Sequence, residues 1–390
     1  MNEPSEVRLM KYLVFLNPLM IGYKIFLKMK AKIVALTMII SVSAFANCGT
    51  TEKEVFSEDK VKTTFANPVW DGADPWMTQQ GDDYVYCYSA NNSILISRSK
   101  YLTRKGELKR IWQAPASGWN SHSVWAPEIH FVDGHWYVYY AAGSTPGSPF
   151  INQRTGVLRS KTADAFSDYE DMGMLYTGDN PDDPQSNVWA IDMTVLEHKG
   201  KLFAIWSGWK EQRDTDATPQ HLYIQEMENP YTLKGTRVLL SSPEESWETG
   251  GPLNLNEGAQ ILKNGNQVFV VYSCRESWLK EYRQGMLQLN DPDGNLLDPS
   301  NWTKKGPVFE GTAQVHGVGH VSFVKSPDGT EDWIVYHSKK TTEPGWDRNV
   351  RMQPFGWNAD GTPNFGTPVL AGKEIDRPSG EVEIEEAENK

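Results

Sequence analysis

Tyr84-Val85-Tyr86-Cys87-Tyr88-Ser89 is the first of five stretches that decide the fold of this chain. The same pattern, an aromatic strand-like run that ends in an aromatic and a small residue, returns at 136–141, 202–207, 268–273 and 333–338. The copies begin roughly 52 to 66 residues apart. A turn that contains Gly or Asp precedes each copy, which is typical of the second strand of a β-hairpin.

A first strand of each hairpin is expected upstream of its turn. These strands begin near Asp74, Ala126, Asp192, Glu257 and His320. Further strand candidates follow each copy, and residues 64–375 contain no amphipathic helix of normal length. A β-sandwich has no such long repeat and a β-helix repeats far more often. The sequence therefore predicts an all-β fold, a five-bladed β-propeller with four antiparallel strands per blade.

The composition excludes some functions. The 390 residues carry a formal net charge of -12, whereas a nucleic-acid-binding protein normally shows a basic surface, so we expect no nucleic-acid partner. The three cysteines have neither a paired framework nor metal-binding CxxC spacing. Cys87 and Cys274 lie in aromatic strand-like runs, so we expect them to be buried thiols.

The N-terminal region has the order of an export signal. Basic residues at 28–32 precede an apolar run at 33–46, and Cys48 follows. This order is typical of a secretory signal peptide, and the run is short for a membrane span. Cys48 resembles a bacterial lipoprotein acylation site. We expect export to the periplasm or cell surface, with a lipid anchor in the outer membrane through Cys48. An N-terminal membrane anchor that uses residues 12–26 is the alternative.

These observations divide the chain into four parts. Residues 1–48 are the targeting segment, in which Met29 could be the true start. Residues 49–63 are polar and charged and are expected to form a tether. The propeller is expected over 64–375. Residues 376–390 form an acidic tail that we expect to be mobile.

Acidic residues recur where the first strand of each hairpin begins. This position carries Asp74, Ala126, Asp192, Glu257 and His320 in the five repeats. The inner strands of a propeller surround its axis, so these residues should converge at one mouth of the channel. Crowded buried carboxyls are costly, and they push their pKa values apart. A glycosidase needs two such carboxyls beside the scissile bond. A turn or cap role is the alternative for any one of them.

At these residues the chain resembles glycoside hydrolase family 43, the five-bladed arabinofuranosidases, arabinanases and xylosidases. The matching stretches are Gly72-Ala73-Asp74-Pro75, Trp125-Ala126-Pro127-Glu128-Ile129, Ile191-Asp192, Asn256-Glu257-Gly258, 317–323 and 348–357. Each stretch is weak alone, and their order and spacing together are specific. Residues 72–76 and 352–355 look most like the exo-acting α-L-arabinofuranosidases.

The resemblance implies roles for three acids. Asp74 would be the general base that activates water, and Glu257 the general acid that protonates the leaving oxygen. Asp192 would orient Glu257 and keep its pKa raised. Asp71 is an extra acid close to Asp74 and the rival for the base. Asp74 is preferred because it keeps the repeat register and precedes Pro75.

The resemblance also implies substrate and ion contacts. Arg348 would bind the sugar that is cleaved off, with Arg351 as its rival, and Trp125 would line the sugar pocket. His320 would contact a hydrated Ca²⁺ or Na⁺ ion in the channel; a histidine bound only to channel water is the alternative. Four further tryptophans are candidates for stacking on the leaving group: Trp76, Trp119, Trp189 and Trp209.

We therefore expect an inverting glycosidase, with no cofactor required for its chemistry, that releases α-L-arabinofuranosyl residues from arabinose-containing plant polysaccharides or oligosaccharides. Endo-arabinanase and β-xylosidase use the same acids and remain open. A non-catalytic carbohydrate-binding propeller is the alternative from another class, and it predicts that at least one acid is missing. We expect a monomer.

Overall fold

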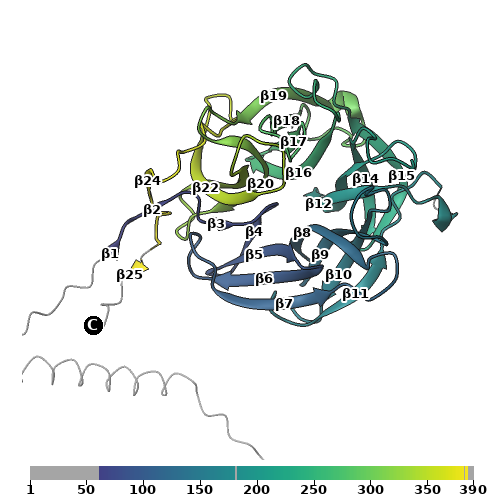
Figure 1. Ribbon diagram of the computed structural model, residues 1–390, viewed down its shortest axis with the longest axis horizontal. Helices are drawn as coiled ribbons and strands as arrows, with labels where there is room; N and C mark the ends of the chain where they lie inside the picture. Colours follow the sequence, from purple (N-terminus) through teal and green to yellow (C-terminus); the bar gives the residue numbers. More distant parts are fainter. Residues whose placement is uncertain (1–60, 181, 382, 385–390) are drawn as a thin grey trace, which may run out of the picture. The chain divides into compact units, whose positions relative to one another are not determined.

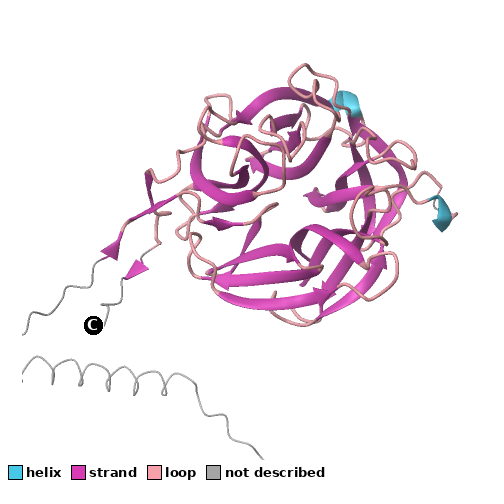
Figure 2. Cartoon of the chain, in the orientation of Figure 1, coloured by secondary structure: helices cyan, strands magenta, loops and turns pink. Residues whose placement is uncertain are grey.

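The computed structural model describes residues 61–180, 182–381 and 383–384, and these belong to one unit, Asp59–Lys390. Within these residues the regular structure is β-strand apart from two short 3₁₀ helices, Pro184–Ser186 and Pro299–Asn301 (Figure 2). The same residues include no helix that is long and apolar enough to cross a membrane. The targeting segment, Met29 and Cys48 lie outside the described residues.

Five four-stranded antiparallel sheets follow one another along the chain. Blade 1 contains β4 (Trp76–Gln80), β5 (Asp83–Ala90), β6 (Ser93–Ser99) and β7 (Glu107–Gln113). Blade 2 contains β8 (His122–Val132), β9 (His135–Gly143), β10 (Arg154–Ser160) and β11 (Tyr169–Met174). Blade 3 contains β12 (Ala190–His198), β13 (Lys201–Gly208), β14 (His221–Asn229) and β15 (Thr232–Ser241). Blade 4 contains β16 (Asn256–Asn264), β17 (Gln267–Cys274), β18 (Arg283–Leu289) and β19 (Trp302–Glu310). Blade 5 contains β20 (His316–Lys325), β21 (Asp332–Lys339), β22 (Arg348–Trp357) and β23 (Pro363–Asn364).

The sheets are arranged as the blades of a propeller (Figure 1). Each inner strand contacts the next around the axis, in the order β4, β8, β12, β16 and β20, and β20 contacts β4. The five repeated aromatic stretches fall on the second strand of each blade. The five-bladed β-propeller predicted from the repeats is confirmed.

The core consists of apolar layers between neighbouring blades. Each of the five main clusters of buried apolar side chains joins two adjacent blades, including blades 5 and 1. Cys87 and Cys274 are fully buried in two of these layers, so the expected buried thiols are confirmed. The aromatic runs therefore hold the blades together, because burial of large apolar side chains is the main favourable term in folding.

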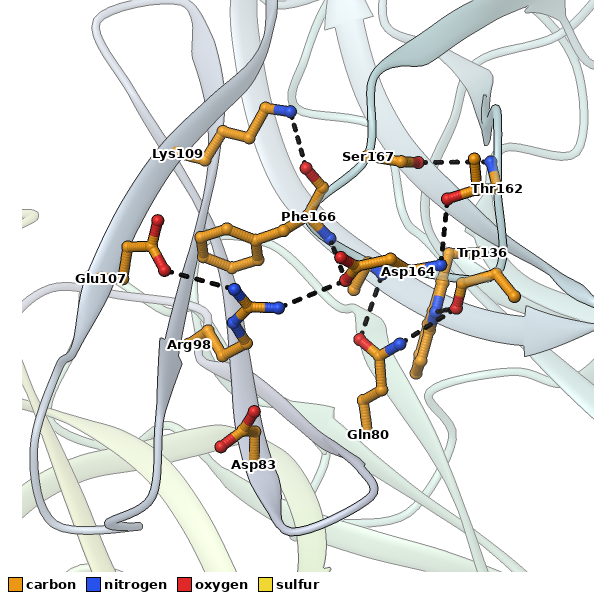
Figure 3. A network of polar contacts seen from close by, with 12 residues as sticks. Gln80, Asp83, Arg98, Glu107, Lys109, Trp136, Thr162, Asp164, Phe166 and Ser167 are labelled. Carbon is orange, nitrogen blue, oxygen red and sulfur yellow. Dashed lines mark hydrogen bonds and ion pairs between the residues drawn. The ribbon is translucent and has the colours of Figure 1, made fainter.

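Polar contacts add to this packing at the outer edge of blades 1 and 2 (Figure 3). The guanidinium of Arg98 on β6 lies 4.2 Å from the ring centroid of Phe166 in blade 2, and it pairs with Asp164 and Glu107. Gln80 at the end of β4 donates to the carbonyl of Ala163. These contacts fix the loop before β11 against blade 1.

The ring closes where the start of the chain meets the last blade. β3 (Trp70–Asp71) pairs with the beginning of β22, and β23 pairs with the end of the same strand. The buried side chain of Asn67 donates to the carbonyl of Met352 at 2.7 Å and accepts from its N–H at 3.0 Å. The side chain of Asn67 thus pairs with the backbone of β22 as a neighbouring strand residue would.

The two ends of the described chain also pair outside the ring. β2 (Thr64–Ala66) pairs with β24 (Glu374–Asp376), and β1 (Val61–Lys62) with β25 (Glu383–Ile384). Paired strands therefore extend into both the predicted tether and the predicted acidic tail.

The first residues of the acidic tail are packed against the propeller, which differs from the mobile tail that we expected. Arg377 and Glu381 are buried and form an ion pair of 2.6 Å. Glu381 also accepts hydrogen bonds from the N–H of Leu102 and the hydroxyl of Thr103. The physical reason is that Arg377 neutralises the buried carboxylate, whereas the acidic composition alone suggested a solvated segment.

Replacing Asn67 tests the closure. Asn67→Ala removes two buried hydrogen bonds and leaves the N–H and C=O of Met352 unpaired, so it should lower the free energy of unfolding by about 2 to 4 kcal/mol. Urea unfolding measures this change. In the control Asn264→Ala, the last residue of β16 loses one part-buried hydrogen bond to Gly361, and the expected cost is below about 1 kcal/mol. Equal costs for the two variants would contradict the closure role.

Candidate active site

Each inner strand has a residue in the left-handed backbone region at the axis. These residues are Asp74 (φ 47°), Ala126 (φ 40°), Asp192 (φ 53°), Gly258 (φ 56°) and His320 (φ 50°). In blades 2 to 5 the pairing with the second strand shifts register here, as at a β-bulge. The repeated position is thus a backbone feature, and left-handed non-glycine residues are often found at functional sites.

Blade 4 corrects the register expected from the sequence. The predicted alignment placed Glu257 in the repeated position, but the left-handed residue there is Gly258 and Glu257 precedes it. A Cβ atom on Gly258 would lie 3.1 Å from the Nδ1 atom of His320, so a side chain there would crowd the histidine. Glu257 reaches the axis from the neighbouring position.

All six predicted site residues line one cavity of about 690 Å³. They are Asp74, Trp125, Asp192, Glu257, His320 and Arg348. They come from all five blades, so the site depends on the closed ring. The acids meet as the propeller argument required.

Asp74 lies among cationic and imidazole groups. Its Oδ1 atom lies 3.1 Å from Arg348 Nη1, 3.2 Å from His337 Nδ1 and 3.4 Å from His320 Nδ1. Burial alone would raise the pKa of Asp74, but Arg348 first, then His320 and His337, outweigh burial and hold the pKa well below its usual range. The side chain keeps 21% of its surface exposed. Asp74 is therefore a carboxylate that solvent can reach.

Glu257 and Asp192 have the opposite electrostatics. Burial raises the pKa of Glu257 to about 7, and the charge of Asp74 adds to this, although the hydrogen bond from Tyr282 opposes it. Burial raises the pKa of Asp192 to about 8, with further increases from Glu257 and Asp74. The N–H of Gly258 donates to Asp192 Oδ2 at 3.1 Å. One ionised acid thus faces two acids that hold protons near neutral pH, the arrangement that acid–base catalysis needs.

The structure decides between two pairs of rivals. Arg351 is buried away from the cavity and bonds Ser338, Asn349 and the carbonyl of Val369, so Arg348 is the arginine at the site. Asp71 pairs with Lys340 on the exposed side of β3, so Asp74 is the acid that faces the cavity.

Tryptophans line opposite walls of the cavity. Trp189 stacks on buried Trp209, with ring centroids 4.8 Å apart and an angle of 4° between the ring planes. Trp125 contacts Phe150 edge-on, with ring centroids 4.8 Å apart. On the other side Trp278 lies 5.1 Å from Trp346, which is 57% exposed. Of the four tryptophans expected to stack on a leaving group, only Trp189 lines the cavity. Trp76 donates to the carbonyl of Ile129, and Trp119 packs on Tyr140.

Sequence reasoning missed three buried groups near the acids. Tyr282 donates to Glu257 at 2.9 Å, and His337 contacts Asp74. Glu128 is buried on β8, and its Oε2 atom lies 3.1 Å from His130 Nε2. Burial raises the pKa of Glu128 to about 8. In the sequence His337 occupies the position of the closing aromatic in the fifth repeat, and Glu128 is part of the stretch 125–129. Tyr282 lies in a loop that carries no repeat signal.

Comparison with known proteins agrees with this geometry. Residues 65–363 match the family model of the glycosyl hydrolases family 43. The chain belongs to this family. A match over most of the chain carries the assignment, and the axial acids lie within it.

The relatives and structures that resemble the chain include arabinofuranosidases. An extracellular exo-α-(1→5)-L-arabinofuranosidase of Streptomyces avermitilis is 36% identical over the aligned region. That region covers 79% of this chain and 64% of the relative's own length. A protein of the same name from Streptomyces chartreusis is 32% identical over 72% of this chain and 84% of its own length. The crystal structure of an α-L-arabinofuranosidase from Lactobacillus brevis superposes with a TM-score of 0.71 at 33% identity, covering 79% of this chain and 98% of that one.

The family resemblance also implied an ion at His320. Among the described residues no group of three or more His, Cys, Asp or Glu side chains is arranged to hold a metal. His320 offers a nitrogen, whereas Ca²⁺ prefers six to eight oxygen ligands. These side chains alone do not fit such a site. A Ca²⁺ or Na⁺ ion at His320 stays a prediction of the resemblance.

The raised pKa of Asp192 predicts how stability depends on pH. Between pH 7 and 8 the native state holds protons at Asp192 that the unfolded chain has released, so stability should fall as pH rises. Asp192→Asn should flatten this fall, measured by urea unfolding at several pH values. The exposed control Asp214→Asn should keep the wild-type slope. An unchanged slope in Asp192→Asn would mean that this carboxyl is ionised in the native protein.

Proposed function

We propose that this protein is an inverting exo-α-L-arabinofuranosidase that releases arabinofuranosyl residues from arabinose-containing plant glycans. The observation that carries the proposal is the opposite protonation of Asp74 and Glu257 in one cavity, since the pKa of Asp74 is depressed and that of Glu257 is about 7. The names of the two Streptomyces relatives support the choice of sugar.

Asp74 acts as the general base. It is ionised across the neutral range, and its partial exposure leaves room for a water molecule. An inverting glycosidase places its two carboxyls roughly 6.5 to 9.5 Å apart, so that the water fits between the base and the anomeric carbon. Asp74 takes a proton from this water while the oxygen attacks the anomeric carbon. Arg348 holds the carboxylate in place at 3.1 Å.

Glu257 acts as the general acid. With a pKa of about 7 it holds its proton in mildly acidic solution and transfers it to the glycosidic oxygen as the bond breaks. Burial and the charge of Asp74 keep that pKa raised. The bond from the N–H of Gly258 fixes Asp192 beside the acid. The rate should therefore fall as pH rises through about 7. Because Asp192 and Glu257 titrate together, the fall in rate on the alkaline side of the pH–rate profile reports the apparent pKa of the pair.

The walls of the cavity favour exo action. The loop at Ser148 and Phe150 is tied to Asp216, which accepts from the Ser148 hydroxyl at 2.9 Å and the Phe150 N–H at 3.0 Å. This tie holds the part of the wall that packs against Trp125 through Phe150, and a fixed wall favours a pocket for one terminal sugar. Endo-arabinanase and β-xylosidase share the acids and remain the alternatives. A non-catalytic binding propeller is disfavoured because all three acids are present at the cavity.

The location and assembly state are further parts of the proposal. Export agrees with the extracellular relatives and with the basic and apolar order of residues 28–46. Lipid attachment at Cys48, residence in the periplasm or at the cell surface, and the monomeric state stay predictions.

Hydrolysis of a linear α-1,5-arabino-oligosaccharide tests the function, with NMR of the freshly released sugar. Single arabinose units of inverted anomeric configuration are the expected products. Oligomeric products would replace the proposal by endo-arabinanase. Inert arabino-oligosaccharides together with cleaved xylo-oligosaccharides would replace it by β-xylosidase, and inertness of both would favour the binding protein.

Two acid variants separate the catalytic roles. Asp74→Asn and Glu257→Gln should each lower kcat on arabino-oligosaccharides by roughly 10²- to 10⁴-fold. On a nitrophenyl arabinofuranoside Glu257→Gln should be far less impaired, because nitrophenolate leaves without a proton, whereas Asp74→Asn should stay equally impaired. The control Asp71→Asn changes the rival acid on the exposed side of β3 and should keep wild-type activity. Loss of activity in Asp71→Asn alone would reverse the assignment of the base.

Trp346 tests the side of the cavity that receives the leaving group. Trp278 lies in the loop between β17 and β18 of blade 4, the blade that carries the acid. Its partner Trp346 has an exposed ring whose centroid lies 5.5 Å from the guanidinium carbon of Arg348. Trp346→Ala should raise KM for arabinotriose several-fold, because stacking on the sugar is lost, with little change in kcat. Trp302→Phe, which alters a buried tryptophan between blades 3 and 4, is the control and should leave KM unchanged. An unchanged KM in Trp346→Ala would exclude the ring from substrate binding.

A further inference from the structure

The proposed acid and base come from blades that are not neighbours. Glu257 belongs to β16 of blade 4, and Asp74 lies two residues before β4 of blade 1. Blade 5 lies between them in the ring. Inversion requires the two carboxyls to keep a fixed separation, and a misplacement of about 1 Å can cost roughly 100-fold in rate. Some structure in blade 5 must therefore transmit the position of one acid to the other.

Tyr282 holds the acid. It directly precedes β18 of blade 4, it is fully buried, and its hydroxyl lies 2.9 Å from Glu257 Oε1. The bond stabilises the charged form of Glu257, and it opposes the rise in pKa that burial causes. Tyr282 is not among the residues that line the cavity. It acts on the reaction only through Glu257.

His337 holds the base. It is fully buried on β21 of blade 5, and its Nδ1 atom lies 3.2 Å from Asp74 Oδ1 and 3.1 Å from the backbone N of Asp74. The backbone N–H of Asp74 donates to this Nδ1 atom, so His337 fixes the backbone of Asp74 directly. Burial lowers the pKa of His337 to about 4, so the ring is neutral in the working range and contributes position rather than charge.

The two rings stack on each other. Their centroids are 5.4 Å apart and their planes differ by 10°. Gly319 of β20, the cross-strand partner of His337, makes room for the stack. A Cβ atom on Gly319 would lie 2.1 Å from the Tyr282 ring, which could not then reach His337. The packing of three blade elements thus brings the two rings together.

We infer that Tyr282 and His337 form one positioning unit, a buried ring stack that fixes the general acid against the general base. This inference rests on the proposed function. The chain of contacts runs from Glu257 through the Tyr282 hydroxyl, across the stack to His337, and on to Asp74. A change in either ring should be felt at both acids.

The pH dependence of kcat/KM on arabino-oligosaccharides tests the unit. Tyr282→Phe keeps the stack but removes the hydroxyl that stabilises ionised Glu257, so the pKa of Glu257 should rise. The alkaline limb should move to higher pH, and kcat should fall roughly 10- to 100-fold with little change in KM. The other groups around Glu257 stay in place. They are Asp74, Asp192, Glu276 and Arg348.

His337→Asn tests the coupling between the rings. The amide oxygen can still accept from the N–H of Asp74, but the stack is lost and Tyr282 loses its support. The alkaline limb should move in the same direction as in Tyr282→Phe, although no contact joins His337 to Glu257 among the described residues. The double variant should shift no further than Tyr282→Phe alone, because both changes act through the same hydroxyl.

Tyr272→Phe is the matched control. It removes a buried tyrosine hydroxyl that donates to a buried carboxyl, Glu248, in the same blade but outside the cavity. It should lower stability and leave the pH profile unchanged. An alkaline limb that stays in place in Tyr282→Phe would overturn the role of Tyr282. A limb that moves in Tyr282→Phe but not in His337→Asn would overturn the coupling.

The pH dependence of urea unfolding provides a readout without substrate. A higher native pKa of Glu257 should extend the loss of stability to higher pH in both variants but not in Tyr272→Phe. If the free energy of unfolding falls over the same pH range in these variants as in the wild type, Tyr282 and His337 do not act as one positioning unit. Inactive wild-type protein would count against the proposed function alone, since the unfolding data would still decide the inference.

Discussion

Asp74 lies at the start of blade 1 and Arg348 at the start of β22 in blade 5, and their ion pair of 3.1 Å spans the point where the ring closes. The backbone closes beside it, where β3 and the side chain of Asn67 pair with β22. Closure therefore brings the ends of the fold together and completes the site at the same place. A propeller that stayed open would separate Asp74 from the guanidinium that contributes most to lowering its pKa.

The site obtains different chemistry from similar backbones. Five inner strands bend at the same left-handed position, and the cavity places their side chains around one axis. Burial would raise the pKa of every carboxyl there. Arg348, His320 and His337 all contact Asp74 and together outweigh burial there, whereas burial prevails at Glu257 and Asp192, which keep protons near neutral pH. The placement of Arg348 and the two histidines thus separates the pKa of Asp74 from those of the other two acids.

The fold and the acids were predictable because both repeat. Aromatic strands with turns at regular spacing predicted the blades, and the start of each inner strand marked Asp74 and Asp192. The offset of Glu257 follows from strict counting, because Gly258, like Asp74, Ala126 and Asp192, lies 14 residues before the closing aromatic of its repeat. The acidic side chain of Glu257 drew the alignment one residue away. Tyr282 and Trp346 lie on loops whose course depends on tertiary packing. The buried end of the tail at Glu381 depends on a partner at Thr103, far away in sequence.

The left-handed position has a consequence for how such a protein can diversify. The position is occupied by Asp, Ala, Asp, Gly and His in the five blades, and the backbone adopts the same conformation each time. The scaffold therefore demands a conformation here rather than a side chain. Exchanges among residues that tolerate this conformation would change the charge at the axis while the blades remain as they are. The ring offers five interchangeable sites at which selection could alter the reaction without inventing a new architecture.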